Sequence, residues 1–267
     1  MTRREDFRFF DVLRVRWAEV DLQKIVFNGH YLMYLDTAVA GYWRALALPY
    51  HEAMHMLGGD LYVRKATLEY HASAHYDERL EVGMRCQRIG NSSILFTAGI
   101  FRGDTLLVSG ELVYVFADPQ SQTSRPVPPA LREILQGFEA GQPMFTLEMQ
   151  AEPGDLSEQG IVARNRLGQE VGVARLGGDA PASGDSAPAG RLQTLDVHAG
   201  VRGSGIGRAL VEAAASGARE QGWAELRCRT PRALAGFLQR VGFSAREPAV
   251  QDDAAGSWQE MVRLLPA

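Results

Sequence analysis

The chain has 267 residues, 46% of them hydrophobic, which indicates two domains that can each bury a core. A formal charge of −4 and the lack of a lysine- and arginine-rich block argue against nucleic acid as a partner. The charged residues 1–6 are not followed by an apolar run long enough for a signal peptide, and no later run suits a membrane span. Cys86 and Cys228 lie far apart and indicate no disulfide framework. We therefore expect a soluble, cytoplasmic protein that binds neither nucleic acid nor membrane.

The first half of the chain predicts one long helix and a meander of strands. Alternating apolar residues predict a strand over 9–17, and helical spacing predicts a helix over 28–46 that ends before Pro49. A turn region is expected at 50–59. Further strand patterns cover residues 61–70, 79–89, 93–102 and 105–117. This order predicts an α+β domain in which an antiparallel sheet wraps around one long helix.

The second half alternates strands and helices and has no internal repeat. A glycine- and proline-containing stretch at 141–143 separates the halves, so we place the domains at residues 1–140 and 146–267. The residues of 177–190 are mostly Gly, Ala, Ser and Pro, which predicts a mobile loop. Strands are predicted near 145–149, 160–166, 170–176, 191–198, 224–229 and 260–265, and helices at 206–221 and 232–241. This pattern predicts an α/β domain.

A single acid, Asp21, lies between the first strand and the long helix. A carboxylate can attack a thioester or activate water, and free amides at a helix N-terminus can stabilise the oxyanion that forms. We expect those amides at Asn28 and Gly29. The alternative is that Asp21 only caps the loop or the helix.

Residues 8–135 resemble the hotdog-fold acyl-CoA thioesterases of the 4-hydroxybenzoyl-CoA thioesterase type. The resemblance rests on Val15, Asp21, Ile25-Val26-Phe27, Tyr31, Arg88-Ile89-Gly90-Asn91-Ser92-Ser93 and the closing strand of residues 110–116. It implies that Asp21 is catalytic, and that a homodimer or homotetramer forms because such sites are built across a dimer interface. Gln23 and Lys24 stand where family members often have small residues or glycine.

Two other polar groups in this half are candidate sites. Arg88, with Ser92 and Ser93 near a turn, could hold the phosphates of coenzyme A; otherwise they are polar groups of an ordinary hairpin. Residues 51–55 match the His-Glu-x-x-His zinc pattern. They fall in the expected turn region without an obvious third ligand, so we predict no metal site.

A glycine-rich turn in the second half follows a strand and opens a helix. Consecutive amides in such a turn, together with the helix dipole, favour a pyrophosphate. The residues predicted to bind the cofactor are Val197, Arg202, Gly203, Ser204, Gly205, Ile206, Gly207 and Arg208. The alternative is a glycine-rich turn without a ligand.

This turn looks like the acetyl-CoA loop of the GNAT N-acetyltransferases, and residues 237–243 resemble that family's second signature; the likeness covers about 146–265. Leu238 stands where GNAT enzymes usually carry the tyrosine that acts as general acid, and Pro231 stands where they carry an asparagine. Asp196, on the preceding strand, is a candidate base that acts through water or, alternatively, an acid that only bonds backbone.

Both halves therefore point to coenzyme A thioesters as substrates, with no permanently bound cofactor. The preferred hypothesis is an acyl-CoA thioesterase fused to a reduced GNAT-like domain that binds acetyl-CoA. Two alternatives stay open: an N-acetyltransferase whose hotdog half mainly dimerises, and a non-catalytic CoA-binding regulator. The sequence does not identify the acyl group, the acyl carrier or the acetyl acceptor.

Overall fold

A computed structural model describes residues 2–151, 159–179, 189–246, 251–253 and 256–266. The chain divides into two compact units, Met1–Met144 and Phe145–Ala267, each with its own sheet. The units are described separately below.

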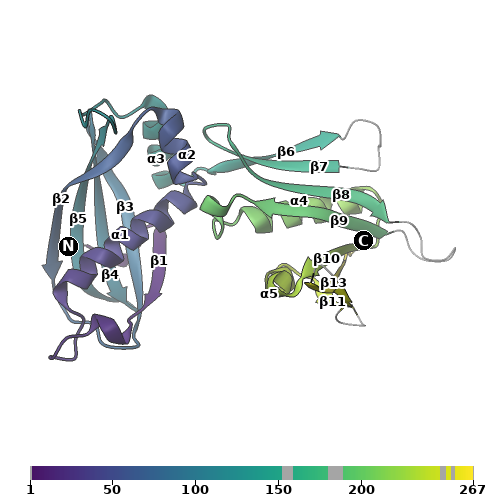
Figure 1. Ribbon diagram of the computed structural model, residues 1–267, viewed down its shortest axis with the longest axis horizontal. Coiled ribbons are helices and arrows are strands. Elements are labelled where there is room, and N and C mark those ends of the chain that lie inside the picture. Colours follow the sequence, from purple (N-terminus) through teal and green to yellow (C-terminus); the bar gives the residue numbers. More distant parts are fainter. Residues whose placement is uncertain (1, 152–158, 180–188, 247–250, 254–255, 267) are drawn as a thin grey trace. The chain divides into compact units, whose positions relative to one another are not determined.

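The N-terminal unit is an antiparallel sheet with one long helix against it (Figure 1). Its strands follow the spatial order β1-β3-β4-β5-β2, so β1 and β2 form the edges. The elements are β1 (Phe9–Arg14), a short helix η2 (Trp17–Glu19), α1 (Asn28–Ala45), α2 (Tyr50–Leu57), β2 (Asp60–Tyr70), β3 (Arg79–Ile89), β4 (Ser93–Arg102), β5 (Thr105–Ala117) and α3 (Pro129–Glu139).

Helix α1 packs on the sheet through one face. Its buried residues recur at helical spacing: Tyr31, Tyr34, Leu35, Ala38, Gly41, Tyr42 and Trp43. The helix approaches the sheet closely at Gly110 of β5, where an added Cβ would lie 2.9 Å from Leu35 Cδ1. The opposing face of the sheet supplies Val82, Phe96 and Leu112, all buried. The helix and the sheet thus form one core.

Helix α1 ends as expected, although the mechanism is not proline alone. Ala47 adopts a left-handed conformation with φ 56°, and its amide donates to the Arg44 carbonyl at 2.9 Å. The Leu48 amide donates to the Trp43 carbonyl at 3.2 Å. These two bonds satisfy carbonyls that a helix end leaves free, which is the Schellman arrangement.

The expected turn over residues 50–59 is wrong, because residues 50–57 form helix α2. Ala53 and Met54 are buried, while His51, Glu52 and His55 are exposed. The two buried side chains give this short segment a core contact that periodicity over so few residues does not reveal. No cluster of three or more metal-ligating side chains occurs in the described part of the chain.

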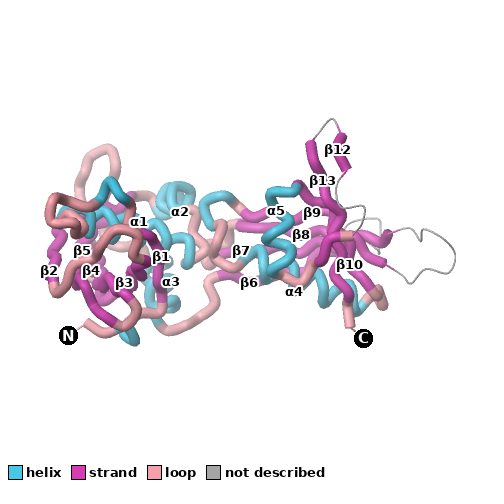
Figure 2. Tube along the Cα trace, turned by 90° about the horizontal axis from the view of Figure 1, so that it is seen from below, coloured by secondary structure: helices cyan, strands magenta, loops and turns pink. Residues whose placement is uncertain are grey.

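The C-terminal unit is a mixed sheet in the order β11-β13-β10-β9-β8-β7-β6. Helix α4 packs against β7, β8 and β9, and α5 packs against β10 and β13 (Figure 2). The elements are β6 (Phe145–Ala151), β7 (Gln159–Asn165), β8 (Glu170–Asp179), β9 (Ala189–Val197), α4 (Ile206–Glu220), β10 (Glu225–Pro231), α5 (Arg232–Arg240), β11 (Ser244–Ala245), β12 (Gln251–Asp253) and β13 (Gly256–Leu264).

The loop expected at 177–190 is shorter than its composition indicated. Strand β8 extends to Asp179 and β9 begins at Ala189, because they pair with each other out to those residues. Residues 180–188 lie outside the described part. The last strand also starts earlier than expected, at Gly256, and pairs with β10 and β12.

The predicted α+β fold class is confirmed in both parts: an antiparallel sheet with one long helix is followed by an α/β unit.

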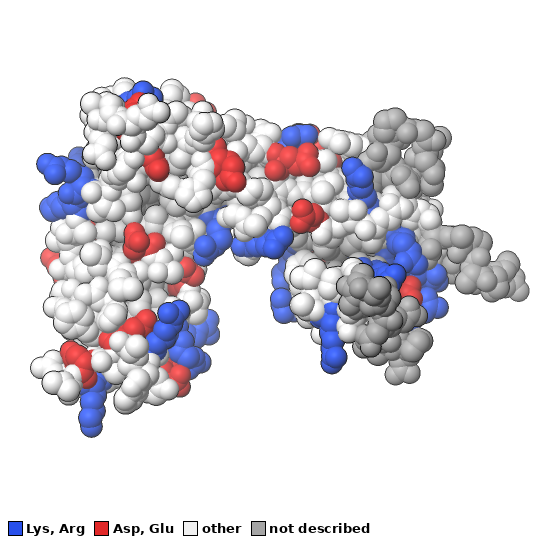
Figure 3. All heavy atoms as spheres, viewed as in Figure 1, with Lys and Arg blue, Asp and Glu red and all other residues white. Residues whose placement is uncertain are grey.

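No helix among the described residues is long and apolar enough to cross a membrane. On the face drawn in Figure 3, both units carry side chains of both charge signs, and neither presents one continuous basic surface there.

We expect Tyr42→Phe to destabilise the N-terminal unit. The buried Tyr42 hydroxyl donates to Glu139 Oε1 at 2.5 Å and thereby ties α3 to α1. Losing this charge-assisted bond should lower the free energy of unfolding by about 1.5–3 kcal/mol. Urea unfolding of the full chain measures it. Tyr62→Phe, at an exposed tyrosine of β2, is the control. Equal unfolding midpoints for the two variants would contradict the role of the Glu139 contact.

Candidate active site and phosphate cradle

Asp21 sits in a tight loop between η2 and α1. Its carbonyl accepts from the Lys24 amide and its amide donates to the Ile25 carbonyl, both at 2.9 Å. Its Oδ1 accepts from the Gln23 amide at 2.7 Å. Oδ2 has no hydrogen-bond partner among the described residues, so one carboxylate oxygen is available for chemistry.

The same loop accounts for the departure at Gln23 and Lys24. Lys24 has φ 63°, a left-handed conformation that glycine adopts at lower cost. The chain closes the loop nevertheless, because the Val20–Val26 bridge and the Asp21 bonds hold both of its ends. The carboxylate is therefore fixed in position without the small residues that the resemblance led us to expect.

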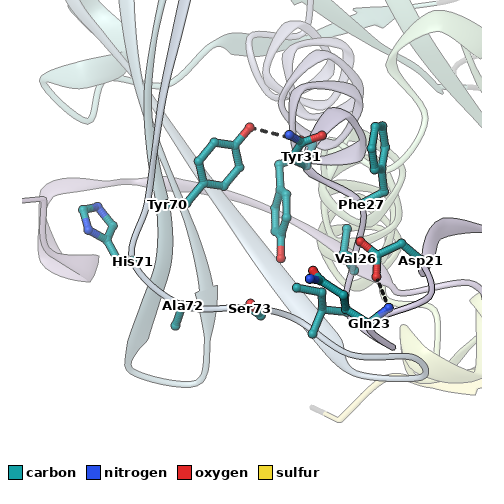
Figure 4. A pocket seen from close by; sticks show the side chains of 11 residues that line it. Asp21, Gln23, Val26, Phe27, Tyr31, Tyr70, His71, Ala72 and Ser73 are labelled. Atoms are coloured by element: carbon teal, nitrogen blue, oxygen red, sulfur yellow. Dashed lines mark hydrogen bonds between the residues drawn. The ribbon is translucent and has the colours of Figure 1, made fainter.

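A cavity of about 390 Å³ opens beside Asp21 (Figure 4). Residues from the loop, the start of α1 and the connection after β2 line it: Asp21, Gln23, Ile25, Val26, Phe27, Asn28, Tyr31, Tyr70, His71, Ala72 and Ser73. Tyr70 and His71 lie on opposite sides of the strand, and Tyr70 turns toward Tyr31 (Figure 4). The sequence prediction included Asp21 and Asn28 but not the tyrosines.

The N-terminus of α1 supplies the free amides. Phe27 precedes the helix as its cap, so Asn28 and Gly29 are its first two residues. Their amides have no intrahelical acceptor, and neither donates a hydrogen bond within the described part of the chain. Tyr70 donates to the Asn28 carbonyl at 3.1 Å and fixes the strand to the helix start. The structure thus brings the predicted Asp21 and Asn28 to one cavity, whereas Gly29, the next residue of α1, is not among its lining residues.

An ion pair supports the cavity wall at Ser73. Arg102 donates to the Ser73 carbonyl at 3.3 Å and to Glu78 Oε1 at 3.0 Å. Partial burial acts to raise the pKa of Glu78, but hydrogen bonds from the His75 amide and from Arg102 outweigh it and hold the pKa below its ordinary value. The charged form of Glu78 is therefore the one that holds this wall.

Arg88, Ser92 and Ser93 do not lie beside Asp21. The Asp21 loop bridges to His75, just before β3, whereas Arg88 is near the other end of β3, roughly 30 Å away at strand spacing. Ser92 lines a second cavity, of about 460 Å³, at that end. The other lining residues are Tyr62, Val63, Arg64, Val115, Ala117, Gln122 and Ser124.

The glycine-rich turn of the C-terminal unit forms a cradle of amides. Gly203 and Gly205 have φ 91° and 94°, and Gly205 caps α4. Ile206, Gly207 and Arg208 then form the first turn of α4, where amides lack intrahelical acceptors. Ser204 Oγ is buried without a hydrogen-bond partner. An anion in the turn would give this hydroxyl a partner.

The side chains around the cradle are held by the preceding strand. Arg202 donates from Nε to the Val197 carbonyl at 3.0 Å, and its Nη2 lies 3.6 Å from Asp196 Oδ1. Asp196 is thus exposed and lies beside a cation. Strand β9 pairs with β10 only over Ala189–Arg191, so the strands part toward the cradle.

The structure places the two residues that differ from the GNAT pattern, Leu238 and Pro231, in helix α5 and at its start. Leu238 is buried in α5 with 2% exposure, so no acid group occupies that position. Pro231 caps α5. Phe237 reaches the cradle helix, because an added Cβ at Gly207 would lie 3.3 Å from its ring. Phe237 therefore fixes α5 against the start of α4.

Comparison with known proteins agrees with this arrangement. Residues 23–109 match the family model of the thioesterase superfamily, and residues 157–245 match that of a GNAT acetyltransferase domain. The chain therefore carries a thioesterase-superfamily domain of hotdog-like architecture, followed by a GNAT domain. Asp21 lies two residues before the first match begins.

Individual relatives cover the N-terminal half. Acyl-CoA thioester hydrolase YbgC of Escherichia coli is 27% identical over 124 residues, which are 45% of this chain and 89% of that protein. A putative esterase of Aquifex aeolicus is 28% identical over 91 residues, 34% of this chain and 70% of that protein. A solved structure from Pseudomonas aeruginosa is 27% identical with a TM-score of 0.45, covering 51% of this chain and 94% of the other.

We expect Glu78→Gln to lower stability in a pH-dependent way. A carboxyl whose folded pKa is depressed stabilises the fold above its unfolded pKa, about 4.3 for Glu, and loses this effect as pH falls through the folded pKa. The variant should be less stable than the parent at pH 7, and the difference should shrink below pH of about 4. Thermal unfolding from pH 7 to 3 measures it. Glu133→Gln on the exposed face of α3 is the control, and a difference that is constant with pH would contradict the pairing.

Proposed function

We propose that the N-terminal domain, residues 1–140, hydrolyses acyl-CoA thioesters at Asp21. The observation that carries the proposal is that Asp21, with a free Oδ2, and Asn28, with an unpaired amide, line one cavity; the unpaired amide of Gly29 follows next in α1. The match to a family of thioesterases and the likeness to an acyl-CoA thioester hydrolase support the same reaction.

The chemistry follows from these groups. The Asp21 carboxylate attacks the thioester carbonyl carbon, or takes a proton from a water that attacks it. The carbonyl oxygen becomes an oxyanion, and the Asn28 and Gly29 amides, with the positive end of α1, stabilise it. The C–S bond breaks, and the leaving thiolate takes a proton from water or from protonated Asp21. Where Asp21 attacked directly, water then hydrolyses the acyl–Asp21 anhydride, so either route consumes one water and gives a carboxylic acid and the free thiol of coenzyme A.

A second copy of the chain completes the site in this proposal. Strand β2 is a long edge strand whose Val63 and Tyr70 are each 52% exposed, and such an edge favours pairing with another strand. An antiparallel pair of β2 strands would set Val63 of the partner subunit near Tyr70. The partner's second cavity would then adjoin the Asp21 cavity, which would bring the partner's Ser92 to the entrance.

Charges along β2 favour that antiparallel register. Lys65 and Glu69 lie on one face of the strand, because they pair with alternate residues of β5, Val113 and Ser109. With Thr67 at the two-fold axis, Lys65 faces Glu69 of the partner subunit twice. Across the sheet, Lys65 pairs with Val113, Val113 with Leu95, and Leu95 with Arg88, so Arg88 lies on the same face as Lys65. Ser93 lies on this face too, and both side chains could receive the phosphates of coenzyme A.

For residues 146–267 we propose coenzyme A binding at the cradle of residues 202–208. The left-handed glycines, the free amides and the buried Ser204 hydroxyl support a pyrophosphate there, and Val197 is on the strand edge beside it. Acetyl transfer is the second candidate, favoured by the family match. The buried Leu238 argues for binding without transfer.

Two free cysteines fit a reducing compartment such as the cytoplasm.

We expect Asp21→Asn to lower kcat for thiol release by about 100-fold or more, because the amide can neither attack nor take a proton. Release of free thiol from a panel of acyl-CoAs measures it. Asp104→Asn, at the exposed β4–β5 turn, should retain full activity. Equal rates for the parent and Asp21→Asn would refute hydrolysis at this site.

We expect Lys65→Glu to weaken dimerisation by roughly tenfold, because two opposite-charge pairs become like-charge pairs. Adding Glu69→Lys should restore the dimer by exchanging the two charges. Light scattering across a dilution series measures both variants. If the double variant dissociates as readily as Lys65→Glu alone, the register with Thr67 on the axis is wrong.

We expect Gly205→Val to abolish binding of coenzyme A at the cradle, because a β-branched residue does not tolerate φ 94°. Arg202→Ala should weaken it. Calorimetric titration of the full-length Gly205→Val variant with coenzyme A should show one class of binding sites fewer than titration of the parent. Gly222→Val is a matched control, at a left-handed glycine after the C-terminal end of α4, the end opposite the cradle. Unchanged binding in Gly205→Val would exclude the cradle.

A further inference from the structure

The Asp21 cavity contains a buried donor without an acceptor. The Tyr31 side chain is 3% exposed, and its hydroxyl oxygen accepts from the Ala74 amide at 2.9 Å. The hydrogen of that hydroxyl has no acceptor among the described residues. The neighbouring Ser73 Oγ, which also lines the cavity, has no hydrogen-bond partner there either.

The position of Tyr31 follows from helix geometry. It is three residues after Asn28, so the two lie on one face of α1. Side chains on a helix point back toward its N-terminus, which carries the Tyr31 ring to the cavity. Figure 4 shows the ring between Tyr70 and Val26, with its hydroxyl on the side of Gln23. Edge contacts with Tyr34 and Tyr70, at centroid distances of 5.9 and 5.7 Å, hold it in place.

The Tyr31 hydroxyl stays protonated at neutral pH and so remains a hydrogen-bond donor. Burial is the main cause that raises the pKa of Tyr31, so the phenol keeps its proton. A buried donor without an acceptor is costly, and a ligand that supplies an acceptor recovers that cost. The amides of Asn28 and Gly29 already serve the reacting carbonyl in the proposed reaction. Tyr31, one turn further along α1, is therefore available to the remainder of the acyl group.

We propose that this cavity selects acyl groups that carry a neutral oxygen acceptor, such as a hydroxyl, keto or phenol oxygen, over hydrocarbon acyl groups of the same size. Tyr31 is the specificity-determining residue, and Ser73 supplies a second hydroxyl on the same wall. The inference rests on the proposed thioesterase function and names its substrate class. A site built to hydrogen-bond a substrate oxygen discriminates strongly against the analogue that lacks it.

The test compares matched CoA thioesters in the parent and in Tyr31→Phe. The pairs are butyryl and 3-hydroxybutyryl, hexanoyl and 3-oxohexanoyl, and benzoyl and the three hydroxybenzoyl isomers. The parent should show about tenfold higher kcat/KM for the oxygenated member of at least one pair. Tyr31→Phe should bring that ratio close to one. Tyr34→Phe, which removes a hydroxyl bonded to Glu19 outside the cavity, should keep the preference.

Two results would overturn this inference while leaving the proposed function intact: the parent prefers no oxygenated substrate, or the parent and Tyr31→Phe show the same preference. In both cases Asp21→Asn still abolishes thiol release. Thiol release that does not depend on Asp21, or none from any substrate, would instead refute the proposed function and this inference with it. The two failures are therefore distinguishable in one set of assays.

Discussion

The packing of α1 on the five-stranded sheet is the interaction on which the N-terminal unit depends. It buries Tyr31, Leu35 and Tyr42 against β3, β4 and β5, and burial of large side chains is the main source of stability in such a domain. The close approach at Gly110 fixes where the helix lies along the strands. Because the helix is held in this way, its free N-terminal amides stay beside the Asp21 loop. The core therefore positions the groups proposed to carry the chemistry.

A second constraint comes from the edge of that sheet. A single copy leaves β2 unpaired on one side and separates the Asp21 cavity from the cavity at Ser92. The proposed antiparallel pairing addresses both features, since a two-fold axis exchanges the ends of β2. Lys65 and Glu69 then neutralise each other across the edge. In this view the acid of one subunit and the CoA-binding groups of the other form one site.

The coenzyme A site proposed for the C-terminal unit uses different physics. Its cradle depends on backbone amides and the α4 dipole, which left-handed glycines make possible at Gly203 and Gly205. Arg202 donates to the Val197 carbonyl and so attaches the turn to β9. Leu238 replaces an acid group with core packing against the sheet. These features suit the proposed phosphate binding, and Leu238 cannot donate a proton for transfer.

The sequence alone determined the local features: the long helix of α1, the meander of strands, the cradle turn, and the placement of Asp21 just before a helix N-terminus. These depend on periodicity, glycine spacing and neighbouring residues, which a linear pattern contains. Only the tertiary structure decided that residues 50–57 are helical, that Lys24 closes the loop with φ 63°, and that Arg88 lies far from Asp21 in one chain. It also brought Tyr31 and Ser73 to one cavity. Such features depend on contacts between residues distant in sequence, and burial and strand register, not local preference, set those contacts.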